Sequence, residues 1–131
     1  MSAEIPSGGP SIALGRLDDP VRLEQQLRRI IRQGNGTLRL TVPNGRARLG
    51  DFAVGQGESV PGDLLVIKGD ADLFGRVGGS VVTLDGDIVL HPGSVVTGSA
   101  LAIGGRVRDR GGVVQGDVRA LGAVPDRKSV V

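Results

Sequence analysis

The sequence has 131 residues with a net charge of +2, 23 glycines, two phenylalanines and no cysteine, tryptophan or tyrosine. This length allows one domain with a modest core, and the lack of cysteine excludes disulfides and thiolate metal sites. The small net charge does not by itself indicate a nucleic-acid partner. No apolar run approaches the roughly 18 residues of a membrane span, and the first 30 residues lack the pattern of a signal peptide.

The first 17 residues contain proline and glycine without an apolar period, so we expect a flexible lead. Residues 18–33 predict an amphipathic helix, because Asp18 or Asp19 can cap it and Pro20 suits its first turn. Gly34 follows as a stop signal. The apolar face of this helix consists of Leu23, Leu27, Ile30 and Ile31.

Residues 36–121 are punctuated by glycine, which recurs in three columns at intervals of 17, 19 and 18 residues. The columns are Gly62, Gly79, Gly98 and Gly116, then Gly69, Gly86 and Gly105, then Gly75, Gly93 and Gly111. Two positions after these glycines stand only apolar residues, which we assign to the interior: Leu64, Val81, Ala100, Val118, Ala71, Ile88, Val107, Val77, Val95 and Val113.

A repeat of this length with three glycine corners predicts an all-β fold, a three-sided β-helix with regular coils over residues 57–121. The stretch "GRARLGDFAVGQG" before them is expected to add one weaker coil. Glycine suits the corners because a bend needs φ > 0 or a backbone so crowded that a Cβ would clash with the next coil. Aspartate or serine follows many of these glycines, and we expect these side chains to make local hydrogen bonds to the backbone.

Two outward surfaces stand out on the predicted solenoid. Leu65, Val82 and Leu101 occupy outward positions on the first side, so we expect an exposed aliphatic strip that serves as a contact surface. The second side carries a basic outer face of Arg106, Arg108 and Arg110. This face is interpreted either as a solvated strand surface that resists aggregation or as a site for an anionic partner.

The two ends of a solenoid leave strand edges and an apolar cross-section open. We expect the helix at residues 18–34 to cap the first coil; the alternative is that it lies on a membrane, since Arg28, Arg29 and Arg32 flank its apolar stripe. The tail at residues 122–131 is too short and polar to cover the last coil. The sequence therefore predicts end-to-end self-association through Val113, Val118, Ala120 and Leu121.

The segment "GDVRA" at residues 116–120, with "GDLLV", "GSVVT" and "GSALA" before it and "GRV", "GSVV" and "GGVV" between them, resembles the bactofilin or polymer-forming cytoskeletal family. The resemblance covers about residues 57–121, half of the chain. It implies a right-handed β-helix that polymerises without nucleotide and acts as a scaffold at the bacterial envelope. The helix at residues 18–33 and the small number of coils depart from that pattern.

Taken together, these features predict a non-enzymatic, self-assembling scaffold with no catalytic residues, no cofactor and no metal. Its expected partner is a second copy of itself, with a membrane surface or envelope proteins as further candidates, and neither nucleic acid nor a small-molecule substrate is expected. We expect a cytoplasmic, membrane-associated protein, with export to the envelope as the alternative. A structural subunit of a larger membrane-bound complex is a further alternative.

The enzyme alternative is a hexapeptide-type acyltransferase that uses His91, the only histidine, as a general base. The inward positions step by 4 to 7 residues, whereas that fold needs a near-strict step of six, and no acid is expected beside His91. His91 is therefore interpreted as a surface residue before a corner proline. The "DAD" and "DGD" segments at residues 70–72 and 85–87 match no calcium-binding repeat and are interpreted as turn residues.

Overall fold

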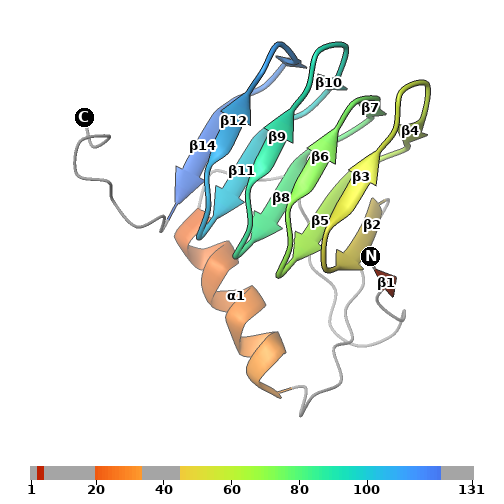
Figure 1. Ribbon diagram of the computed structural model, residues 1–131. Helices are drawn as coiled ribbons and strands as arrows, with labels where there is room; N and C mark the ends of the chain where they lie inside the picture. The colour runs from red at the N-terminus through yellow and green to blue at the C-terminus, as the bar shows by residue number, and fades with distance from the viewer. Residues whose placement is uncertain (1–2, 5–19, 34–44, 122–131) are drawn as a thin grey trace.

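The structure is a computed structural model that describes residues 3–4, 20–33 and 45–121, with the side chains of 21–30 and 45–121. The predicted lead, apart from residues 3–4, and the predicted tail at 122–131 lie outside the described residues. The chain forms a three-sided β-solenoid of about four coils, and one helix, α1 (Pro20–Gln33), lies against it (Figure 1).

Each coil contributes one strand to each of three parallel sheets. The largest sheet contains β2 (Gly45–Leu49), β5 (Asp63–Ile67), β8 (Val81–Leu84), β11 (Ala100–Ile103) and β14 (Val118–Leu121). A second sheet contains β3 (Phe52–Val54), β6 (Ala71–Leu73), β9 (Ile88–Leu90) and β12 (Val107–Asp109). The third contains β4 (Ser59–Val60), β7 (Arg76–Val77), β10 (Val95–Val96) and β13 (Val113–Val114).

The short strand β1 (Ala3–Glu4) joins the largest sheet from outside the coils. It pairs antiparallel with β2, with Ala3 opposite Leu49 and Glu4 opposite Arg48. This pairing falls within the segment that the sequence analysis expects to be a flexible lead. β1 therefore covers part of the strand edge at the start of the solenoid.

The strand register confirms two of the three predicted interior columns. Arg46, Leu64, Val81, Ala100 and Val118 stack in one column, and Phe52, Ala71, Ile88 and Val107 stack in another. The first column begins with an arginine at the weaker coil that precedes the regular ones.

The third column is corrected by one residue. Val60 and Val77 stack on Val96 and Val114, so Val95 and Val113 take the outward phase. Val96 is fully buried, and Val113 is 54% exposed. The turn after Gly93 and Gly111 is one residue longer than the turn after Gly75, and a shift of one residue moves a side chain to the other face of a strand.

The glycines of the second column allow close approach between coils, as predicted. A Cβ on Gly86 would meet the backbone of Gly69, and one on Gly105 would meet the backbone of Gly86. The residue just before each glycine takes the positive φ angle instead, including Lys68 at 57° and Asp85 at 61°. The bend and the close approach are thus divided between two adjacent residues.

Most polar corner side chains bond to the following coil, which corrects the prediction in part, whereas Ser94 makes the predicted local bond, its Oγ donating to the carbonyl oxygen of His91 at 2.7 Å. The carboxylates of Asp51, Asp70 and Asp87 accept the backbone N–H groups of Asp70, Asp87 and Arg106 at 2.8, 2.8 and 2.9 Å. A second ladder runs from Asp63 through Ser80 and Ser99 to the N–H of Asp117, with distances of 2.9, 3.1 and 3.0 Å. In both ladders, each side chain accepts an N–H group from the coil that follows it, so the two ends of the solenoid are not equivalent.

Helix α1 crosses the outer face of the largest sheet and does not cap the first coil (Figure 1). Leu23 is 6% exposed and Leu27 fully buried; Ile30 is half-buried, and the side chain of Ile31 lies outside the described residues. The residues beneath the helix include Leu65, Val82 and Leu101, together with Ile67, Leu84 and Ile103.

The predicted aliphatic strip of Leu65, Val82 and Leu101 is consequently covered and not exposed. The physical reason is that three successive coils place two aliphatic side chains each on this outer face, which matches the apolar stripe of a helix. Arg28 anchors the same side, because its Nη2 lies 2.9 Å from Oδ1 of Asp85. This hydrogen bond raises the pKa of Arg28 above its ordinary value, with a further contribution from Glu24.

Candidate assembly surface

The last coil exposes apolar side chains at an open end of the solenoid. Val118 in β14 is 53% exposed, Ala120 is exposed, and Leu121 is half-buried against the cluster beneath α1. Among the described strands, β12, β13 and β14 are the last of their sheets, so each has one hydrogen-bonded neighbour there. The end therefore combines unpaired strand edges with the exposed parts of three interior columns.

Three of the four predicted contact residues lie in the last strand, where they divide between its two faces. Val118 and Ala120 stack on Ala100 and Ala102 of the interior, whereas Leu121 continues the outer face from Ile103. Val113 belongs to the outward phase, and its neighbour Val114 is the interior residue. The apolar surface that faces along the solenoid axis is thus made by Val107, Val114, Val118 and Ala120.

One interior column ends on a carboxylate that the sequence analysis did not single out. Asp109 stacks on Leu90 and Leu73, and its Oδ1 accepts the N–H of Gly111 at 2.9 Å. Its position two residues after Val107 repeats the spacing of Ala71 and Leu73, and this spacing is the signal that could have revealed it. A negative charge therefore lies in the cross-section of the open end.

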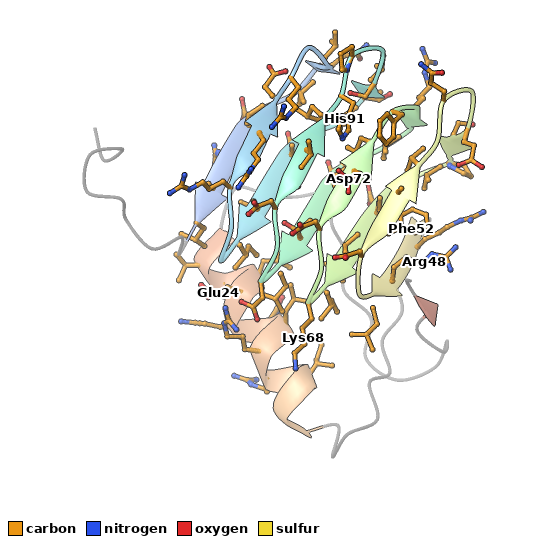
Figure 2. All side chains as sticks on the ribbon, viewed as in Figure 1. Glu24, Arg48, Phe52, Lys68, Asp72 and His91 are labelled. Carbon is orange, nitrogen blue, oxygen red and sulfur yellow. The ribbon has the colours of Figure 1, made fainter. Side chains whose placement is uncertain are left out.

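The first coil has a different chemistry. Arg46 and Arg48 occupy the interior columns that Leu64 and Val66 continue, and the guanidinium of Arg48 lies 5.0 Å from the ring centroid of Phe52 (Figure 2). Three aliphatic residues of this coil are buried, with Ala47 7% exposed, Val54 1% and Val60 4%, whereas Leu49 is 37% exposed. The start of the solenoid is therefore basic, and it is better covered than the last coil.

The predicted basic outer face lies beside the last coil. Arg106, Arg108 and Arg110 are all exposed. The Nε of Arg108 lies 3.1 Å from Oδ2 of Asp87, one coil earlier. Part of the positive charge on this face is therefore neutralised within the chain.

His91 has an acidic neighbour, contrary to the prediction. Its Nε2 lies 3.0 Å from Oδ1 of Asp72, and its ring stacks on Phe74 with the centroids 4.0 Å apart (Figure 2). Asp72 and His91 are 19 residues apart, which is one coil of the repeat, so the spacing itself could have indicated the pair. The arrangement is a histidine–carboxylate dyad on the outer surface.

The aspartates of the "DAD" and "DGD" segments are all engaged in protein contacts. Asp70 and Asp87 belong to the corner ladder, Asp72 pairs with His91, and Asp85 pairs with Arg28. Among residues 3–4, 20–33 and 45–121, no group of three or more histidine, cysteine or acidic side chains is placed to hold a metal ion. In the same part of the chain, no helix is long and apolar enough to cross a membrane.

Comparisons of the chain with protein-family models, with curated proteins and with solved structures gave no match.

Proposed function

We propose that this protein is a non-enzymatic structural scaffold that assembles by end-to-end contact of its β-solenoid. The observation that carries the proposal is the last coil, where Val118 is 53% exposed in an interior column on the edge strand of a sheet. Open edges and exposed apolar columns favour pairing with another strand. A second copy of the chain supplies coils of matching width and repeat.

The buried position of the α1 stripe also supports a contact at the solenoid end. Leu23 and Leu27 are buried against the sheet, so this stripe is not available to a membrane or to a partner. Contact through the last coil instead leaves α1 in place. The resemblance of the repeats to bactofilins agrees with such assembly, and a location at the bacterial envelope is part of the same proposal.

Electron microscopy of the purified protein in negative stain tests this function. We expect rods one solenoid wide that form without added nucleotide. A solution that contains only compact single particles at every concentration would contradict the proposal. The variant Asp72→Asn is the matched control, because it changes an outer-face residue away from both ends and should leave the rods intact.

The dyad of His91 and Asp72 supports one alternative function, an acyltransferase in which His91 acts as the general base. An aspartate beside a histidine can orient the ring and stabilise its charged form. Under this alternative, His91→Ala abolishes hydrolysis or transfer of an acyl thioester. Under the scaffold proposal, His91→Ala still forms rods, and neither this variant nor the unchanged protein consumes the thioester.

A further inference from the structure

We infer that assembly has one polarity, with the last coil of one molecule docking on the first coil of the next. This inference rests on the proposed function and adds the identity of the partner surface. The basic first coil and the last coil with its inward carboxylate are the two surfaces that meet. The partner is a second copy of this chain.

The strand register defines the contacts of such a junction. Continuing each interior column by one coil places Val118 against Arg46, Ala120 against Arg48, and Val107 against Phe52 of the next molecule. In the third sheet, Val114 meets Val60. Apolar residues thus meet in the second and third sheets, at Val107 and Val114, whereas Val118 and Ala120 of the largest sheet meet arginines and Asp109 meets Val54.

Charge complementarity distinguishes this polarity from contact between two last coils. The first coil brings Arg46 and Arg48 into the cross-section, and the last coil brings Asp109. In the polar junction, Asp109 lies against Val54, within the same cross-section as the two guanidinium groups, so opposite charges meet at one junction. In a symmetric junction of two last coils, Asp109 would face a coil that brings a second Asp109 and lacks Arg46 and Arg48.

The second ladder of corner side chains, which begins at Asp63, favours the same direction. Asp63, Ser80 and Ser99 each accept a backbone N–H from the following coil. Asp117 is the next member, and its side chain is 75% exposed, with its Oδ2 3.6 Å from Nη2 of Arg119. Because Asp63 pairs in register with Gly45, the N–H of Gly45 in the next molecule is the donor that would extend the ladder.

Strand β1 occupies part of the same docking edge. It pairs with Arg48 and Leu49 of β2, which are the residues that Ala120 and Leu121 of a neighbour would face. Arrival of a neighbour therefore displaces β1. Removal of residues 1–17 should strengthen association, whereas a junction between two last coils would not respond to this deletion.

Sedimentation velocity of paired variants tests the polarity. Val118 and Arg46 are exposed, so both positions tolerate substitution, and circular dichroism and urea unfolding verify the fold of each variant. Val118→Arg should weaken association at least about tenfold, because two arginines then face each other. Val118→Glu should associate more tightly than Val118→Arg, because glutamate faces Arg46.

The double variant V118R/R46E provides the rescue. In the polar junction, the new arginine of one molecule faces the new glutamate of the next, so association should return toward that of the unchanged protein. A symmetric junction of last coils predicts that Val118→Arg, Val118→Glu and the double variant are all monomeric, and this result would overturn the inference while leaving end-to-end assembly standing. An unchanged protein that never associates would overturn both the inference and the proposed function.

Discussion

At the scale of single residues, this fold depends on positions where one coil touches the next. Gly69, Gly86 and Gly105 permit contact between backbones, and the residue before each glycine supplies the positive φ angle. Asp70 and Asp87 then bond to the coil that follows. The corners at Gly69 and Gly86 therefore combine a bend, a close approach and a side-chain hydrogen bond in three successive residues.

Substitution of a corner glycine should be much more costly than substitution of a glycine that faces open space. Gly86→Ala places a Cβ against the backbone of Gly69, which cannot move aside as a side chain would, so we expect a loss of about 3 kcal/mol in the free energy of unfolding. Gly57→Ala meets no atom within 4 Å and suffers only from its φ of 79°, so about 1 kcal/mol is expected. Urea unfolding followed by circular dichroism measures both, and equal losses would contradict the packing explanation.

The first ladder of corner side chains, formed by Asp51, Asp70 and Asp87, can be tested at Asp87. Its Oδ1 accepts the N–H of Arg106, and its Oδ2 lies 3.1 Å from Arg108. Asp87→Ala removes both contacts and should lower the free energy of unfolding by about 1–2 kcal/mol. Asp87→Asn keeps an oxygen acceptor and should lose less than half as much; the same loss for both variants would show that the backbone contact contributes little.

At the scale of secondary-structure elements, α1 and the largest sheet form a second core outside the coils. Leu27 is fully buried among aliphatic residues from successive coils, whereas Arg28 contacts Asp85 at the rim. The carboxylates of Asp85 and Glu24 raise the pKa of Arg28 above its ordinary value, at which the side chain is already charged. The ion pair is exposed and contributes little, so the apolar contact dominates.

This packing predicts a large effect of Leu27→Ala. Truncation of a buried leucine should cost about 2–4 kcal/mol in the free energy of unfolding. Gln26→Ala is the matched control, because Gln26 is exposed, and its effect should stay within about 0.5 kcal/mol. Similar effects of the two variants in thermal unfolding would mean that α1 does not hold to the sheet in solution.

The sequence was sufficient to predict the three-sided solenoid, because the glycine columns and the apolar residues after them repeat at one-coil spacing. It did not reveal where α1 would pack, since an apolar stripe fits both an open end and an aliphatic sheet face. The sheet face is favoured by its paired aliphatic residues, such as Leu65 and Ile67. The open end of the first coil is less suitable for an apolar stripe, because it carries the charges of Arg46 and Arg48. The one-residue shift at Val95 was also hidden, because its neighbour Val96 is equally apolar.

For a related reason, only some residues of the candidate assembly surface could be predicted from the sequence. Val118 lies where the repeat places it, but Val113 is on the outer phase and Asp109 in an interior column. A glycine repeat marks corners, and it does not count the residues within each corner. The one-coil spacing of 19 residues was the available signal for the pairing of His91 with Asp72, although the repeat varies from 17 to 19 residues and so does not by itself fix the strand register.

At the scale of the whole molecule, the two ends of the solenoid are chemically different. The first coil is covered in part by β1 and carries inward arginines, whereas the last coil exposes Val118 and ends a column with Asp109. Different ends allow a heterologous contact that repeats from one molecule to the next. The chemical difference between the ends is what the proposed directional assembly depends on.

Hydrogen–deuterium exchange at several protein concentrations tests the central claim most directly, because it measures whether the open edge closes on association. The amides of β12, β13 and β14 that do not bond to the preceding coil, unlike the N–H of Val113, should exchange rapidly in dilute protein and become protected as the concentration rises, while those of β8 and β9 stay protected throughout. Amides of the last coil that are protected in dilute protein, or that exchange at the same rate at every concentration, would contradict the account.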